Sequence, residues 1–342
     1  MFSQLQKALY GLKQAPRAWF QRLGSFLIQL GFYCNRSDTS LFIFHKHSNI
    51  IYLLLYVDEI IIIGNNSSLL ATFTWKLNSE FATKDLGLLS YFLSLESTTT
   101  SDGLFISQLK YARDILTHAQ LLDSKLVHTP MVILQTLSVD GLLFSNPTLN
   151  RSLIGALQYL TITRPDIAHA VDSVSQFLHS PTEDHYLAVK CILHYVKATL
   201  HFGLIFIPFF APGTLVAYSD ADWASCPDTR CSTSDYSIYL GGNLVSWSAK
   251  KQPTVSRSSC ESQYRALALT VAKLLWLTHL LSDLKVLILQ RPLLLCDNKS
   301  AIFLSSNPVS HKRAKHVELD YHFLRELVLA GKLCTQYMPS HL

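Results

Sequence analysis

The feature that most constrains this chain is a run of apolar residues interrupted by two adjacent acids. The run covers residues 50–64, and the acids are Asp58 and Glu59 in Tyr56-Val57-Asp58-Glu59. A run of this kind predicts two buried strands joined by a tight turn, with the acids at the turn. Like charges side by side are costly to bury unless a cation lies next to them. Two interpretations follow: a divalent metal site for phosphoryl or nucleotidyl transfer, or a hairpin whose turn is acidic.

Composition limits the class of protein. The 342 residues are enough for two or three domains with real cores. Because 49% of the residues are hydrophobic and 15% are charged, composition does not indicate disorder. The net charge of +5 is compatible with a nucleic-acid partner but too small to require one.

The seven cysteines include no Cys-x-x-Cys pair, and their number is odd. This pattern argues against a disulfide framework or a zinc cluster and favours a reducing compartment. The N-terminus has no signal-peptide pattern, and no stretch of about 18 apolar residues lacks a charge or proline. We therefore expect no membrane partner and an intracellular location, in cytoplasm or nucleus. The sequence leaves the oligomeric state open.

The last third of the chain places three acids at the ends of predicted elements. An alternating strand ends at Asp220, a long helix over about 259–281 has Glu261 in its first turn, and an apolar strand ends at Asp297. Carboxylates gathered in this way can bind two Mg²⁺ or Mn²⁺ ions. Each acid also has a structural interpretation: Glu261 fits a capping box that begins at Ser258, Asp297 fits a helix cap, and Asp220 fits an acidic turn.

Several blocks resemble one known family. Tyr56-Val57-Asp58-Glu59 resembles the Tyr-Val-Asp-Asp box of reverse transcriptases. Ala8-Leu-Tyr-Gly-Leu-Lys-Gln-Ala-Pro-Arg-Ala-Trp-Phe20 resembles the signature segment of copia-type LTR retrotransposon Pol polyproteins. The blocks around Asp220, Glu261 and Asp297 resemble the ribonuclease H boxes of the same family. The resemblance covers essentially the whole chain, and the blocks stand in the family's order.

The resemblance implies an α+β / α/β fold with three parts. Residues 1–130 are expected to be a partial reverse transcriptase, with palm and thumb but no fingers. Residues 131–205 are expected to be a linker and a helical connection. Residues 206–342 are expected to form a ribonuclease H-like domain, a mixed sheet with helices that lacks the family's last helix.

The resemblance also assigns roles at the polymerase box. Asp58 and Glu59 are the expected catalytic remnant, with Asp58 as a metal ligand. Glu59 stands where the family has a second aspartate, and the upstream catalytic aspartate is expected to be missing. A displaced carboxylate fits metal geometry poorly, so we expect no autonomous polymerase activity. Lys13 and Arg17 are candidate phosphate contacts, with an ordinary solvated cation pair as the alternative.

In the ribonuclease H part, the resemblance makes Asp220, Glu261 and Asp297 catalytic metal ligands and brings His341 near the metals. Gln263 stands where the family often has a second glutamate. The expected cofactor is Mg²⁺ or Mn²⁺, and the expected partner is an RNA–DNA hybrid or template–primer nucleic acid.

Two functions remain open at this point. In the first, the chain is a hybrid ribonuclease that works by two-metal phosphodiester hydrolysis and is joined to an inactive polymerase remnant. In the second, it is a degenerate transposon remnant without catalysis that at most binds nucleic acid.

Overall fold

The computed structural model describes residues 14–57, 59–132, 137–208, 213–307 and 318–339. The chain divides into two compact units, and each is described by itself. The first unit comprises Met1–Leu89 with Thr278–Val286, and the second comprises Ser90–Leu277 with Leu287–Leu342. The expected domain boundaries at 130/131 and 205/206 stay a prediction.

The first unit contains a four-stranded antiparallel sheet in the order β1-β2-β3-β4 with two helices. The elements are α1 (Ala15–Gln29), β1 (Tyr33–Cys34), β2 (Leu41–Lys46), β3 (Asn49–Tyr56), β4 (Glu59–Gly64) and α2 (Ser67–Glu80). Its core combines apolar side chains of the helices with those of β2 and β3, including Leu23, Leu27, Phe42, Leu53 and Phe73. The predicted hairpin across the acidic turn is confirmed by the pairing of β3 with β4.

One sequence expectation fails at the end of this unit. The pattern from Asp85 to Glu96 predicts a strand, but strand structure begins only at β5 (Tyr91–Phe92) and β6 (Leu95–Thr99). Asp85 Oδ1 accepts a hydrogen bond from the Gly87 amide at 2.8 Å, and Gly87 has a φ of 80°. The aspartate thus gives the backbone a local turn in place of a strand ladder.

The second unit begins with a sheet in the order β5-β6-β7-β8 and a group of helices. The further elements are β7 (Leu104–Ser107), α3 (Leu109–His118), α4 (Pro147–Leu160), the short 3-10 helix η1 (Pro165–Ile167), α5 (Ala168–Ser175), α6 (Glu183–Ala198) and β8 (Leu204–Phe206). The dipeptide Asp102-Gly103 is typical of hairpin turns and predicts one here, and the antiparallel pairing of β6 with β7 confirms it. Helices α3 to α6 share one buried apolar core.

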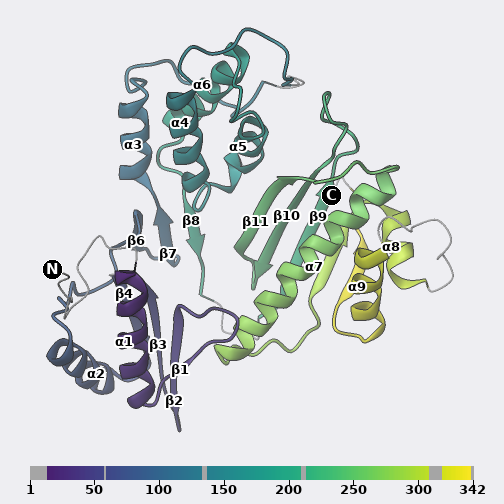
Figure 1. Cartoon of the computed structure of the whole chain (residues 1–342). Helices are drawn as coiled ribbons and strands as arrows, with labels where there is room; N and C mark the ends of the chain where they lie inside the picture. The colour runs from purple at the N-terminus through teal and green to yellow at the C-terminus, as the bar shows by residue number, and fades with distance from the viewer. Residues whose placement is uncertain (1–13, 58, 133–136, 209–212, 308–317, 340–342) are drawn as a thin grey trace, which may run out of the picture. The chain divides into compact units, whose positions relative to one another are not determined.

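The rest of the second unit is a five-stranded mixed sheet in the order β11-β10-β9-β12-β13. Figure 1 shows β11, β10 and β9 next to one another, beside α7. Its elements are β9 (Leu215–Ala221), β10 (Thr233–Leu240), β11 (Asn243–Lys251), α7 (Ser259–Asp283), β12 (Leu293–Cys296), α8 (Lys299–Ser306), α9 (Glu318–Leu329) and β13 (Cys334–Tyr337). Strands β9, β10 and β11 pair antiparallel, whereas β9, β12 and β13 are parallel. The predicted strand that ends near Asp220, the long helix that contains Glu261 and the apolar strand before Asp297 are confirmed as β9, α7 and β12.

Helix α7 is the one helix in the described part of the chain that is long and apolar enough to span a membrane by length and composition. Its apolar side chains also fit a core helix, because Leu267, Val271 and Leu274 are almost fully buried. The hydroxyl of Thr270 donates to Ser219 Oγ of β9 at 3.0 Å, which fixes the face of α7 that meets the sheet.

Candidate functional site

The acidic turn of the first unit is held by a tryptophan. Val57 has a φ of 49°, a left-handed conformation that is unfavourable for a β-branched residue. Trp19 of α1 donates its indole N–H to the Val57 carbonyl oxygen at 2.7 Å. Glu59 is exposed and pairs with Tyr56 as the first residue of β4. This corner of the predicted polymerase box is therefore shaped by a residue that sequence analysis missed.

The other predicted residues at this end are described only in part. Asp58 and Lys13 lie outside the described residues. Arg17 lies on α1 with an exposed side chain. The metal role of Asp58 and the phosphate contacts of Lys13 and Arg17 stay predictions.

In the second unit, Asp220 lies near the end of β9 and Asp297 directly follows β12, and these two strands are parallel neighbours. Leu295 of β12 pairs with Tyr218 of β9, and each aspartate follows its strand residue by two positions. Parallel pairing therefore brings both carboxylates to the same end of the sheet. Both aspartates are exposed. The sequence expectation that these two acids share one end of the sheet is met.

Asp220 lies between a residue that packs on α7 and a neighbouring strand. Ser219, the residue before it, is buried and bonded to Thr270 of α7. Asp235 of β10 pairs directly with Asp220, and its carboxylate lies 3.6 Å from His169 Nδ1 of α5. The carboxylate of Asp235 raises the pKa of His169, although burial of the ring acts in the other direction.

Glu261 is used to cap and stabilise the start of α7. Its backbone N–H donates to Ser258 Oγ at 3.2 Å, and its Oε2 accepts from the Arg257 amide at 3.0 Å. Its Oε1 accepts from the Arg265 guanidinium at 2.8 Å, one helical turn later. These contacts match the capping interpretation of Glu261. For Asp297 the cap interpretation is wrong, because Asn298 caps α8 through a bond from the Ala301 amide.

The α7 side chain that reaches Asp220, at the end of β9, is Gln263. Its Nε2 donates to Asp220 Oδ1 at 2.5 Å and to the Ala221 carbonyl oxygen at 2.9 Å. Its Oε1 accepts from the Cys296 thiol at 3.6 Å, directly before Asp297. Gln263 is 5% exposed, so this amide joins the ends of β9 and β12 from a buried position, although Asp220 itself is exposed.

Helical geometry explains why Gln263 and Glu261 cannot both face the strands. Residues two apart on a helix lie about 200° apart around its axis. The sequence thus carried a signal that only one of the two positions could contribute to the site. It did not say which one, because that depends on how α7 packs on β9.

The donor set around Asp220 does not fit a metal pair. Among the described residues, no group of three or more His, Cys, Asp or Glu side chains is gathered to hold a metal ion. The structure therefore differs from the expected trio of Asp220, Glu261 and Asp297, since Glu261 is engaged by Arg265 and Arg257. An amide N–H also occupies an Asp220 oxygen that a metal would need. His341 lies outside the described residues.

A nucleophilic side chain near the C-terminal end of β11 was not singled out from the sequence. Cys226 Sγ accepts hydrogen bonds from Lys251 Nζ at 3.0 Å and from Thr229 Oγ1 at 3.1 Å. Burial acts to raise the pKa of this thiol, but these hydrogen bonds outweigh burial and lower the pKa to about 7. The result is a thiol that ionises near neutral pH.

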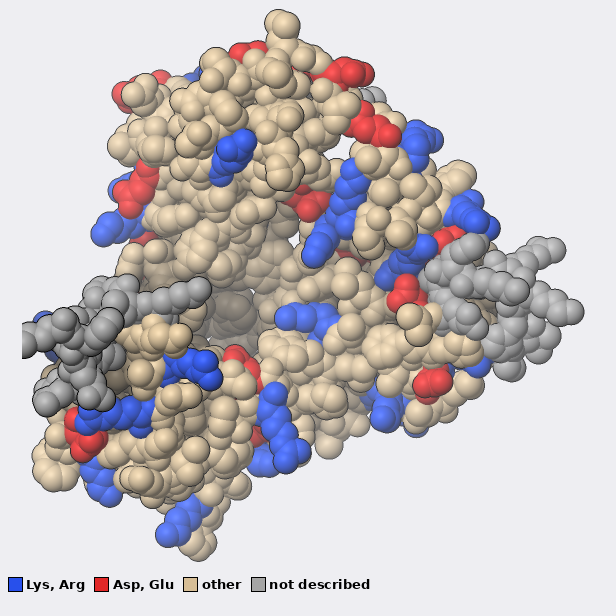
Figure 2. Space-filling view, viewed as in Figure 1, with Lys and Arg blue, Asp and Glu red and all other residues tan. Residues whose placement is uncertain are grey.

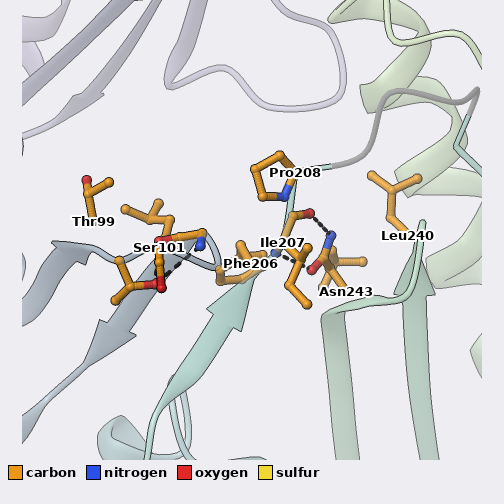
Figure 3. A pocket seen from close by; sticks show the side chains of 11 residues that line it. Thr99, Ser101, Phe206, Ile207, Pro208, Leu240 and Asn243 are labelled. Atoms are coloured by element: carbon orange, nitrogen blue, oxygen red, sulfur yellow. Dashed lines mark hydrogen bonds between the residues drawn. The ribbon is translucent and has the colours of Figure 1, made fainter.

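A cavity of about 560 Å³ lies elsewhere in the second unit, lined mostly by apolar atoms of the β6–β7 turn, β8 and the β10–β11 hairpin (Figure 3). Asn243 accepts from the Ile207 amide at 2.7 Å and donates to the Ile207 carbonyl oxygen at 2.9 Å. The cavity contains none of the predicted site residues, so it does not bear on their chemistry.

Charged residues of both signs are mixed on the surface. Figure 2 shows Lys and Arg scattered among Asp and Glu on a face formed mostly by other residues. Close to the aspartates in sequence, Lys299 begins α8 with its ammonium 4.8 Å from the centre of the Tyr337 ring, and Arg257 precedes α7. Both side chains are exposed. In nucleic-acid complexes, exposed Lys and Arg side chains of this kind contact phosphates.

Comparison with known proteins gives consistent matches. Residues 2–133 match the family described as Reverse transcriptase (RNA-dependent DNA polymerase). The chain is 44% identical over 339 residues to the Retrovirus-related Pol polyprotein from transposon RE1 of Arabidopsis thaliana, which covers 99% of this chain but 23% of that protein. It is 48% identical over 225 residues to the uncharacterized mitochondrial protein AtMg00810 of the same plant, covering 66% of this chain and 93% of that protein.

Among solved structures, the foamy viral protease-reverse transcriptase in complex with dsDNA matches 97% of this chain and 60% of its own. The TM-score is 0.50 at 11% identity, so the likeness concerns the fold alone. The chain spans about a quarter of the length of the Pol polyprotein that it matches, 23% in the case of transposon RE1.

Proposed function

The chain belongs to the Pol polyproteins of copia-type retrotransposons, and from this premise we propose that it binds an RNA–DNA hybrid or template–primer duplex without hydrolysing it. One observation carries the proposal. The Glu261 carboxylate is held by Arg265 and by the Arg257 amide, away from Asp220. A site that cannot gather three carboxylates lacks the charge that a pair of divalent cations needs.

Binding does not require those cations, because phosphates are bound by Lys and Arg and by backbone amides. Lys299 follows Asp297 by two residues, and Arg257 follows Ser256, whose carbonyl oxygen accepts a hydrogen bond from Trp223, three residues after Asp220. The foamy viral protease-reverse transcriptase, which shares the fold, was solved in complex with dsDNA, and this supports a duplex nucleic acid as the partner class. Recognition of a hybrid would use contacts to 2′-hydroxyls across the minor groove.

A second candidate function is supported by the register of β9 and β12. Because Asp220 and Asp297 lie side by side, a weak hybrid ribonuclease with Mg²⁺ or Mn²⁺ held by these carboxylates is the alternative. It would require Gln263 to release Asp220.

The test uses the full chain and a fluorescently labelled RNA–DNA hybrid. Fluorescence anisotropy in EDTA should give a dissociation constant of about 10⁻⁴ to 10⁻⁶ M at moderate salt, and affinity should fall as salt rises. The variant Lys299→Gln should bind more weakly, with a salt slope reduced by about one. The control Lys332→Gln, an exposed lysine before β13 and so at the opposite end of the sheet, should bind like the wild type.

Cleavage is measured on the same samples after addition of Mg²⁺ or Mn²⁺. An intact RNA strand together with binding supports the proposal. Cleavage that Asp297→Asn abolishes would establish the second candidate instead. A folded protein that neither binds the hybrid in EDTA at low salt nor cleaves it with Mg²⁺ or Mn²⁺ would overturn both.

A further inference from the structure

The amide of Gln263 takes the place of a cation between two strand ends. Its nitrogen donates to Asp220 Oδ1 and to the Ala221 carbonyl oxygen, and its oxygen accepts from the Cys296 thiol. All three partners are oxygen or sulfur atoms of β9 and β12, the strands that bring Asp220 and Asp297 together. A side chain with both a donor and an acceptor can join these groups without a net charge.

We propose that Gln263, rather than Glu261, occupies the third position of this carboxylate site and keeps it free of divalent cations, so that Gln263→Glu alone converts it into a cation site. This inference rests on the proposed function and explains at one residue why the chain binds without hydrolysing. The new site would take Mg²⁺ or Mn²⁺, the cations that prefer carboxylate oxygens.

The geometry gives the substitution a clear electrostatic consequence. Glutamate has nearly the size and shape of glutamine, so it fits the space that Gln263 fills at 5% exposure. Without a cation, the new carboxylate would face Asp220 Oδ1 and the Ala221 carbonyl oxygen, and both contacts would change from attractive to repulsive. A divalent cation between these oxygens restores attraction, so folding of the variant and cation binding become linked.

Glu261 provides the matched control. It lies two residues from Gln263 on the same helix, but its carboxylate is bonded to Arg265 and to the Arg257 amide. If Gln263 occupies the third position, Glu261→Gln leaves cation binding unchanged. If Glu261 instead moves and becomes the ligand, Glu261→Gln abolishes cation binding both in the wild type and in Gln263→Glu.

The experiment measures Mn²⁺ binding to the full chain by electron paramagnetic resonance and by the shift in Tm on adding Mn²⁺. We expect Gln263→Glu to bind Mn²⁺ at least about tenfold more tightly than the wild type, since even residues behind a metal ligand change affinity by about 10- to 100-fold. Its Tm should be below that of the wild type in EDTA and should rise with Mn²⁺. The double variant Gln263→Glu with Asp297→Asn should not show this increase in Mn²⁺ affinity.

Three results would overturn the inference. They are tight Mn²⁺ binding by the wild type that Glu261→Gln removes, no gain of affinity in a folded Gln263→Glu protein, and a gain that survives Asp297→Asn. If Gln263→Glu does not fold, the variant Gln263→Ala replaces it in the test. Gln263→Ala removes the amide that is bonded to Asp220, so the inference requires this variant to bind Mn²⁺ more tightly than the wild type. Hybrid binding in EDTA is measured separately, so failure of the proposed function is distinguishable from failure of this inference.

Discussion

Arg164 offers a sharp test of what stabilises the helical part of the second unit. It is 2% exposed. Its guanidinium bonds Asp166 at 2.7 and 2.9 Å, the Thr199 carbonyl oxygen at 3.0 Å and Thr199 Oγ1 at 2.6 Å. It also lies over the rings of Tyr195 and Phe202. One side chain thus ties the corner before α5 to the end of α6.

The expected cost of Arg164→Met follows from which partners lose their bonds. Removing one member of a buried ion pair costs about 3–5 kcal/mol when the other charge stays buried. The side chain of Asp166 is 29% exposed and can regain water, which lowers the cost. The Thr199 carbonyl oxygen loses its bond to the charged guanidinium but keeps the one from the Phe202 amide at 3.0 Å, and a hydrogen bond to a charged group is worth about 1.5–3 kcal/mol. Methionine keeps most of the apolar contact. We expect Arg164→Met to lower the free energy of unfolding by about 3 kcal/mol.

The assay is urea denaturation of the full chain, followed by circular dichroism. The transition that reports the second unit should move to lower urea with an unchanged slope. Arg151→Met is the control, because exposed Arg151 bonds the Leu178 and His179 carbonyl oxygens and its loss should cost less than about 1 kcal/mol. A loss for Arg164→Met no larger than that of the control would refute the reasoning.

Two further predictions concern titrating groups. Iodoacetamide at pH 7 should label Cys226 ahead of the other cysteines, and Lys251→Met should slow this labelling about tenfold or more, as followed by mass spectrometry. Equal rates of Cys226 labelling in the wild type and in Lys251→Met would contradict this prediction. The stabilising contribution of His169 should be full below its unfolded pKa of 6.5 and should be lost as pH rises through its higher folded pKa. The difference in Tm between the wild type and Asp235→Asn should therefore shrink from pH 6 to pH 8. A constant difference would argue against the ion pair of His169 with Asp235.

The ribonuclease H-like sheet was predictable because each of its elements has its own local signal. The alternation before Asp220 and the long apolar helix are local patterns, and their order along the chain matches the observed sheet. The adjacency of Asp220 and Asp297 follows from the parallel pairing that this order implies. The acidic hairpin at Tyr56 and Glu59 was predictable for the same reason.

The rest depended on non-local packing. Strand β8 has three residues and is defined by its pairing with β7, far away in the chain, so no local period indicates it. The choice between Glu261 and Gln263 depends on the rotation of α7 against β9, which Thr270 and Ser219 help to fix. A helix carries its own periodicity in sequence, but not the direction in which it faces a sheet.

The amide at position 263 also has a consequence for how copies of this sequence diverge. Codons for glutamine and glutamate differ in a single base, and the two side chains fill nearly the same volume at this buried position. No repacking of α7 against β9 is needed to pass from one to the other. A lineage of such chains can therefore lose or regain a cation site in one mutational step while the fold stays intact. The surrounding aspartates would then record the ancestral chemistry even in copies that no longer perform it.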